Sequence, residues 1–188
     1  MIVDDNLDRG MWVAAFLRAE HFDPFVVMTD HVGLLREISD KAPDIIIIDM
    51  ASPSRDLLES LAIMSHMNPM PVLMFSAEQD PDYINRAVEA GVTAYMVGDI
   101  EAAKVKPAID VAMAQFRNFQ QLKQQLYETQ IALDDRNLLE RAKSMLMKAK
   151  GVSESEAHDY IRGEAMKRRL KITEVSKLLL DQWSIGTK

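Results

Sequence analysis

Three aspartates and a serine lie where they could form an oxygen-rich site. Asp4 and Asp5 directly follow a short apolar run, Asp49 follows the isoleucine run 45–48, and Ser76 follows another apolar run. If these runs are parallel strands, their carboxyl ends share one edge of a sheet, where open α/β folds form their sites. Carboxylates gathered there repel one another, and Mg²⁺, which prefers oxygen ligands, is the natural counter-ion. A carboxylate beside Mg²⁺ is also a competent acceptor of a phosphoryl group.

Five short apolar runs alternate with segments of helical spacing over the first 112 residues. Four consecutive isoleucines at 45–48 are typical of a strand buried on both faces, as in a parallel sheet. The alternation therefore predicts an α/β domain, an open parallel sheet with helices on both faces. The expected strands are residues 1–3, 25–28, 45–48, 72–75 and 92–97, and the expected helices are residues 7–20, 34–38, 57–67, 83–90 and a long one from residue 105.

Residues 1–112 resemble the receiver domain of response regulators, a flavodoxin-like fold with five parallel strands. Asp4 and Asp5 match the acidic pair that holds Mg²⁺ together with Asp49, and Asp49 matches the phosphoacceptor. Ser76 matches the hydroxyl residue that senses the phosphoryl group, and Tyr95 matches the aromatic switch position. The alternatives are that the acidic cluster is vestigial and that Tyr95 is only a packed strand aromatic.

One departure from the receiver pattern concerns its lysine. The pattern has Lys three residues after the switch aromatic, whereas this chain has Gly98. The missing ammonium would pair with the phosphoryl oxygens and with the carboxylate of Asp49. We therefore expect phosphorylation to be a weaker signal here than in a receiver that keeps this lysine.

The last part of the chain, residues 135–188, is basic. It holds 12 Lys and Arg against 8 Asp and Glu, a net charge of +4, while residues 1–134 have a net charge of −11. Helical spacing predicts three short helices, with a stop at Gly151 and a capping box from Ser153 to Glu156. Their expected core includes Ala142, Leu146, Ala157, Tyr160, Ile161, Ala165, Val175, Leu178 and Leu179. The cations that we expect to meet a nucleic-acid backbone are Arg136, Arg141, Lys143, Lys148, Arg162, Lys167, Arg168 and Lys171.

This basic segment resembles the ANTAR domain, the RNA-binding output module of antiterminator response regulators. The resemblance implies a function in binding RNA stem-loops of leader transcripts. The alternative is a DNA-binding transcription factor with the same receiver. DNA reading places the start of a recognition helix against the duplex, but the second helix here begins Ser-Glu-Ser-Glu, which would repel phosphates. The residues that match the family pattern are Arg136, 140–143, Leu146, Met147, 151–153, Glu156, Ala157, Ile161, Arg162, Ala165, Met166 and 170–175.

Residues 113–134 form the expected connector. Glycine and proline are absent from residues 108–150, which predicts that the last receiver helix continues into the output domain. The apolar residues step by three, four or seven, as in a coiled-coil seam, and a homodimer is the expected consequence. The alternative is an amphipathic helix that packs on its own chain. The seam residues are Phe116, Phe119, Leu122, Leu126 and Leu133.

Two short stretches, residues 52–56 and 106–112, resemble the nitrate-assimilation antiterminators of the NasT type. This resemblance implies control by a nitrate- or nitrite-sensing partner protein. Control by a histidine kinase through receiver phosphorylation is the other possibility, alone or in addition.

The composition excludes several functions. The chain has no cysteine, so a disulfide, a thiolate metal site and a cysteine nucleophile are all excluded. It shows no glycine-rich phosphate loop and no Ser-His-Asp arrangement, and accepting a phosphoryl group is self-modification, so we do not expect an enzyme. No apolar run reaches membrane-spanning length and no signal peptide is visible, which predicts a cytoplasmic protein with no membrane contact.

Overall fold

The computed structural model describes residues 1–28 and 33–186. The chain divides into two compact units, Met1–Gln120 and Gln121–Lys188, and each is described by itself. The division lies inside the segment 113–134 that we expected to connect the two domains.

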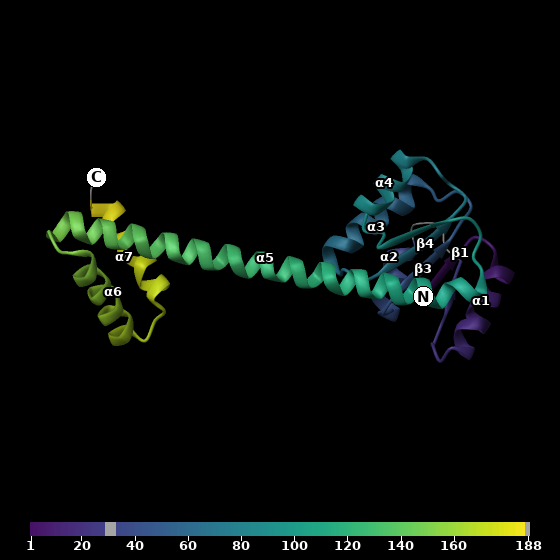
Figure 1. The fold of residues 1–188 in the computed structure, drawn as a ribbon, viewed down its shortest axis with the longest axis horizontal. Coiled ribbons are helices and arrows are strands. Elements are labelled where there is room, and N and C mark those ends of the chain that lie inside the picture. The colour runs from purple at the N-terminus through teal and green to yellow at the C-terminus, as the bar shows by residue number, and fades with distance from the viewer. Residues whose placement is uncertain (29–32, 187–188) are drawn as a thin grey trace. The chain divides into compact units, whose positions relative to one another are not determined.

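The first unit contains a five-stranded parallel sheet with the strand order β2-β1-β3-β4-β5. Figure 1 shows this sheet with helices around it. Its order reverses between β1 and β3, the switch point at which doubly wound sheets place their sites. All five predicted strands are present, and the fold is the flavodoxin-like α/β fold that the sequence predicts. The strands are β1 (Ile2–Asp4), β2 (Val26–Val27), β3 (Ile46–Asp49), β4 (Val72–Ser76) and β5 (Ala94–Val97).

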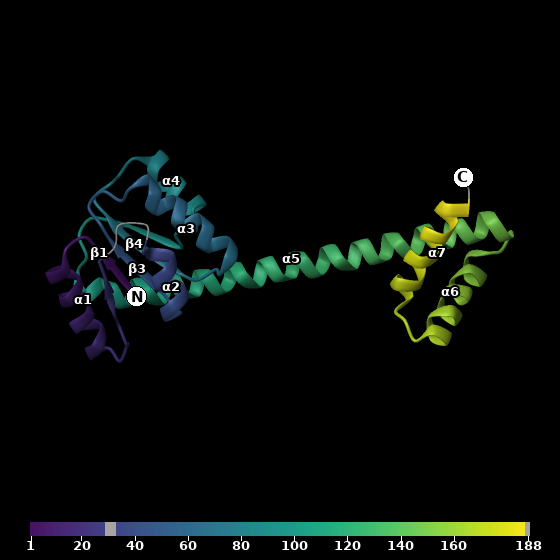
Figure 2. The same cartoon turned by 180° about the vertical axis from the view of Figure 1, so that it is seen from behind.

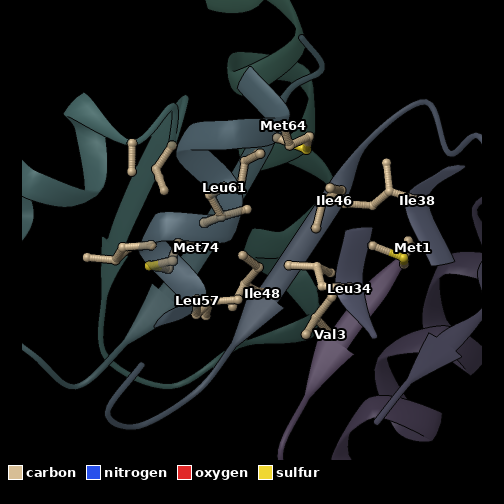
Figure 3. Close-up of a cluster of buried hydrophobic side chains, with 14 of the residues drawn as sticks. Met1, Val3, Leu34, Ile38, Ile46, Ile48, Leu57, Leu61, Met64 and Met74 are labelled. Atoms are coloured by element: carbon tan, nitrogen blue, oxygen red, sulfur yellow. The ribbon is translucent and has the colours of Figure 1, made fainter. Parts of the chain in front are cut away.

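Helices cover both faces of this sheet because both faces are apolar. Figure 3 shows Ile46 and Ile48 of β3 packed against Leu57 and Leu61. The intervening Ile47 belongs to a separate core on the opposite face. Burial on both faces explains the unbroken isoleucine run, since each fully buried side chain contributes about 1.5–3 kcal/mol. The helices are α1 (Leu7–Ala19) and the start of α5 on one face, and α2 (Leu34–Lys41), α3 (Arg55–Met67) and α4 (Pro81–Glu89) on the other.

Helix α5 (Ala102–Lys150) is 49 residues long. Its first turns pack on the sheet through Val105 and Ile109. Pro107 lies within these turns, where its missing N–H removes one helical hydrogen bond without ending the helix. The helix then continues to Gly151, whose φ of +66° is the left-handed conformation that closes many helices. The prediction of one continuous helix is confirmed.

The second unit is a bundle of the end of α5 with α6 (Glu154–Arg168) and α7 (Ile172–Gly186), which lie beside it in both views (Figures 1 and 2). The capping box is formed: Ser153 accepts from the backbone N–H of Glu156, and the Glu156 carboxylate accepts from the backbone N–H of Ser153. Buried apolar side chains come from all three helices. They are Ala142, Leu146, Ala157, Ile161, Ala165 and Val175.

Two residues predicted for this core lie at its surface. Tyr160 is 41% exposed, and the ammonium of Lys150 lies 3.9 Å from its ring centroid, so a cation–π contact replaces burial. Leu178 is exposed as well. The core is small, since three of the six buried side chains named above are alanines.

Among the residues that the structure describes, no helix is both long enough and apolar enough to cross a membrane. Helix α5 has the length, but polar and charged side chains occur along all of it.

Candidate functional site

The acidic residues meet at the carboxyl edge of the sheet, as predicted. Asp4 ends β1 and Asp49 ends β3, and the two are direct partners in the parallel register. Both are buried, with 1% and 3% of their surface exposed. Asp5 follows in the loop and is exposed. The carboxylates therefore gather at the topological switch point, where such folds place their ligands.

A fourth residue, Arg9, lies among these carboxylates and was not predicted. Its Nη2 lies 2.7 Å from Asp4 Oδ1 and 2.8 Å from Asp5 Oδ1, and its Nε lies 2.9 Å from Asp49 Oδ2. Nη2 also donates a hydrogen bond to the backbone carbonyl of Asp49 at 3.0 Å. The spacing of four residues between Asp5 and Arg9 was the available signal, since residues four apart on a helix face each other.

The start of α1 positions Arg9. Asn6 caps the helix by accepting a hydrogen bond from the backbone N–H of Arg9. A Cβ at Gly10 would lie 2.8 Å from a methyl carbon of Val26 and 3.3 Å from Asp4 Cβ. Only glycine therefore allows α1 to approach the sheet closely enough to bring Arg9 over the carboxylates.

Burial raises the pKa of Asp49 to about 6. The Arg9 guanidinium opposes this rise, while the negative charges of Asp4, Asp5 and Asp99 add to it. Oδ2 of Asp49 accepts no hydrogen bond within the described residues although it is buried, because Arg9 Nε is close to it without donor geometry. The predicted phosphoacceptor is thus a carboxylate whose charged form is disfavoured.

Receiver domains typically hold Mg²⁺ at this pocket, but the residues do not fit the ion as they are arranged here. In the described chain, no group of three His, Cys, Asp or Glu has an arrangement suited to a metal. Asp4 Oδ1 already accepts hydrogen bonds from Arg9 Nη2 and from the backbone of Asn6. The predicted ligands Asp4, Asp5 and Asp49 are present, but they surround a guanidinium.

Ser76, the predicted phosphoryl sensor, ties two loops together. It is buried, its hydroxyl donates to the carbonyl of Ala51 at 3.2 Å, and it accepts from the N–H of Glu78 at 3.1 Å. The loops after β3 and after β4 are therefore joined at this side chain.

Tyr95, the predicted switch aromatic, is hydrogen bonded to the loop after β4. Its hydroxyl donates to the carbonyl of Glu78 at 3.0 Å. Its ring meets that of Tyr83 edge-on with centroids 6.4 Å apart, and the Tyr83 hydroxyl donates to the carbonyl of Pro53. Burial raises the pKa of Tyr83 to about 12. The two tyrosines connect β5 and α4 to the loops around the acidic pocket.

Gly98 has a φ of +103°, and a Cβ there would meet nothing within 4 Å. Its N–H donates to the carbonyl of Ser76. A lysine at this position would have space but would need a strained backbone, at a cost of about 1–3 kcal/mol. The local backbone conformation therefore disfavours the receiver lysine at this position.

The predicted RNA-binding cations of the second unit lie mostly on its surface. Lys167 and Arg168 are exposed but pair with Glu164 at 3.1 and 3.2 Å. The other exposed members are Arg136, Arg141, Lys148, Arg162 and Lys171.

Lys143 differs from this group and is a correction to the predicted surface. It is 7% exposed, and its ammonium lies 2.8 Å from Glu140 and 2.6 Å from Glu154. These contacts join α5 to the first turn of α6 and raise the pKa of Lys143. Its function in the structure is to hold the two helices together, so we leave it out of the proposed RNA surface.

A hollow of about 540 Å³ opens at the turn between α6 and α7. Its lining includes Met166, which is 74% exposed, and Leu170. Three cations, Arg162, Arg169 and Lys171, also line it, together with one carboxylate, Asp135. A lining that combines apolar side chains with an excess of cations can receive an unstacked base together with its phosphate.

The five-stranded fold with its acidic edge defines a response regulator receiver. Residues 1–110 match the model of the response regulator receiver domain, and the chain belongs to this family. Residues 128–180 match the ANTAR domain. The chain is therefore a receiver joined to an ANTAR domain, a combination of regulatory domains.

Several characterised proteins are similar. The transcriptional regulatory protein PdtaR of Mycobacterium tuberculosis is 28% identical over 187 residues, which cover 100% of this chain and 90% of that protein. The aliphatic amidase regulator of Pseudomonas aeruginosa is 28% identical over 65% of this chain and 63% of its own. The nitrate regulatory protein of Klebsiella oxytoca is 35% identical over 75 residues, 40% of this chain and 19% of that protein.

Solved receiver structures share the fold. The receiver domain of a modulated diguanylate cyclase from Desulfovibrio desulfuricans has a TM-score of 0.53 at 21% identity, covering 62% of this chain and 93% of its own. The receiver domain of the response regulator NarL from Mycobacterium tuberculosis has a TM-score of 0.51 at 24% identity, with 59% and 92% covered.

Proposed function

We propose that this protein binds structured leader RNA through its second unit and thereby promotes transcription antitermination. The observation that carries the proposal is the hollow at the α6–α7 turn, which is lined by apolar side chains and by three cations against one carboxylate. RNA sequence is read mainly in loops whose bases are splayed out, while cations neutralise the backbone. The match of residues 128–180 to the ANTAR domain supports the same function.

The test compares RNA hairpins from leader transcripts with duplex DNA of the same sequence in a mobility-shift assay. Removing Arg162 and Lys171 together should weaken RNA binding at least about tenfold and lower the salt slope by about two counterions. Arg55→Ala is the matched control, because Arg55 is an exposed cation of the first unit. Equal or tighter binding to duplex DNA would instead support the DNA-binding alternative.

The proposed active form is a homodimer joined through the connector. Phe119, Leu122, Leu126 and Leu133 are all exposed on α5 at heptad spacing, which suits a second copy of the same helix. Two bundles held together would bind paired hairpins more tightly than one, because the second contact becomes intramolecular.

We further propose that a partner protein, and not receiver phosphorylation, is the main input. Asp49 has the position of the phosphoacceptor, yet Gly98 replaces the lysine that would couple a phosphoryl group to Tyr95. The signal that we favour is nitrate or nitrite, sensed by this partner, since a segment of the chain is 35% identical to a nitrate regulatory protein. A partner with a preference of a few kcal/mol for the inactive form is sufficient to shift the populations by orders of magnitude.

A further inference from the structure

The acidic pocket of the first unit already contains a cation, and that cation belongs to the chain. The Arg9 guanidinium contacts all three carboxylates, those of Asp4, Asp5 and Asp49, at 2.7–2.9 Å. We propose that Arg9 is the permanent counter-ion of this pocket, which replaces the divalent cation and keeps the metal out of the native protein. The proposal concerns the receiver alone and does not depend on RNA binding.

The geometry suits a guanidinium better than a metal ion. Arginine presents its N–H groups in a planar fork that can meet several carboxylate oxygens at once. Here Nε donates to both oxygens of Asp4, and Nη2 donates to Asp4 Oδ1, to Asp5 Oδ1 and to the backbone carbonyl of Asp49. Mg²⁺ demands near-octahedral oxygen ligands at about 2.0–2.1 Å and retains several waters. Carboxylates turned toward the fork do not present that shell.

Entry of a metal would have to remove Arg9. Its side chain is 29% exposed and those of Asp4 and Asp49 are 0% and 5% exposed, so the guanidinium lies between the buried carboxylates and the solvent. The affinity for a divalent cation is therefore reduced by the free energy of the ion pairs that must break first. The close approach at Gly10 and the Asn6 cap fix the start of α1. The Arg9 side chain therefore stays beside the pocket and can pair with the carboxylates again when a metal ion leaves.

The experiment measures metal binding by the full chain with Mn²⁺ as the probe, counting free Mn²⁺ by electron paramagnetic resonance. Arg9→Ala should bind one equivalent at least about tenfold more tightly than the native protein, because a positive charge adjacent to the site has been removed. Adding Asp49→Asn to Arg9→Ala should abolish the gain. Arg55→Ala, which removes an exposed arginine from α3, should behave as the native protein does. Native protein that binds Mn²⁺ as tightly as Arg9→Ala would overturn the proposal.

Thermal unfolding gives a second measurement, because three uncompensated carboxylates will destabilise Arg9→Ala without metal. Mg²⁺ should raise the Tm of Arg9→Ala and leave that of the native protein unchanged. Arg9→Lys retains a charge but loses the fork. The rise of its Tm with Mg²⁺ should lie between those of Arg9→Ala and the native protein. If Mg²⁺ fails to restore Arg9→Ala, and Arg9→Lys binds Mn²⁺ no better than the native protein, the proposal is wrong.

Discussion

At the scale of single residues, Asp49 shows how burial and charge oppose each other in the acidic pocket. Its carboxylate lies under the Arg9 guanidinium, yet its pKa is raised to about 6 because burial outweighs the attraction. The folded protein therefore holds a proton on this group more tightly than the unfolded chain does. A charged Asp49 costs stability, and the cost depends on pH.

Asp49→Asn should therefore stabilise the fold at neutral pH. The unfolded carboxyl ionises near 3.8 and the folded one near 6, so the stability of the native protein falls as pH rises between these values. Asparagine does not ionise, and the variant should gain on the order of 1–3 kcal/mol above pH 6 and nothing below about pH 4. Urea unfolding across this range measures the difference. Asp40→Asn at an exposed position controls for the substitution itself. An Asp49→Asn variant that is less stable than the native protein at pH 7.5 would contradict the raised pKa of Asp49.

The sequence located the residues of this site better than it described their environment. The end of each apolar run put Asp4 and Asp49 on one edge of the sheet, because parallel strands align their carboxyl ends. Arg9 was missed because an arginine in the first turn of a helix is usually solvated. The burial of Lys143 was missed for the converse reason, since spacing along α5 does not reveal that Glu154 of another helix pairs with it.

At the scale of elements, the joint between α5 and α6 depends on a buried ammonium. Lys143 contacts Glu140 of its own helix and Glu154 in the first turn of α6. Strands and helices followed from periodicity, but the contacts between them depend on which side chains meet in space. Tyr160 illustrates this, since its predicted burial is replaced by a contact with Lys150.

Lys143→Ala should weaken the bundle by loss of the α5–α6 ion pair, and its effect on RNA should follow from that. We expect the Tm to fall, by less than for a fully buried pair, because Glu140 and Glu154 are 53% and 67% exposed and solvent screens the contacts. A double-mutant cycle with Glu154→Gln in thermal unfolding isolates the Lys143–Glu154 ion pair. Additive effects of the two single substitutions would show that this pair does not stabilise the bundle. Lys148→Ala, an exposed lysine on the same helix, is the control and should leave stability unchanged.

The self-association that we propose for the connector should be lost when charges enter the exposed apolar positions of α5. Leu122→Glu and Leu126→Glu together put like charges opposite each other in a parallel pair of helices and remove its apolar seam. Sedimentation should show a shift to monomer, and affinity for paired hairpins should fall at least about tenfold. Gln121→Glu with Gln125→Glu adds the same charge beside the seam as a control. A native protein that is monomeric both free and bound to RNA would contradict the proposed homodimer.

At the scale of the whole molecule, the coupling that we propose between the receiver and the ANTAR domain does not depend on a phosphorylated aspartate. Gly98 lacks the ammonium, and its backbone conformation disfavours the lysine that would restore it. Control by a protein partner remains available, since it requires only different affinities for two states.

Asp49→Asn should consequently retain antitermination in cells supplied with the inducer. A terminator–reporter fusion measures read-through, and the variant should stay within about twofold of the native protein. Deletion of residues 135–188 provides the inactive reference. Read-through as low as that reference, with Asp49→Asn folded and expressed, would mean that phosphorylation is required.

The uninterrupted course of α5 through the second unit has a consequence for chain length. The seam residue Leu126 and the bundle residue Leu146 lie on one helix, so the angle between their directions is fixed by the number of residues between them. Each added residue turns one against the other by about 100°. Two extra residues between Leu126 and Leu146 would turn the seam to roughly the opposite side of the helix relative to the bundle. Seven extra residues would bring the seam back to within about 20° of its present direction. Relatives that share this connector should therefore differ in its length by about 7, 11 or 18 residues, which preserve this angle to within about 20°.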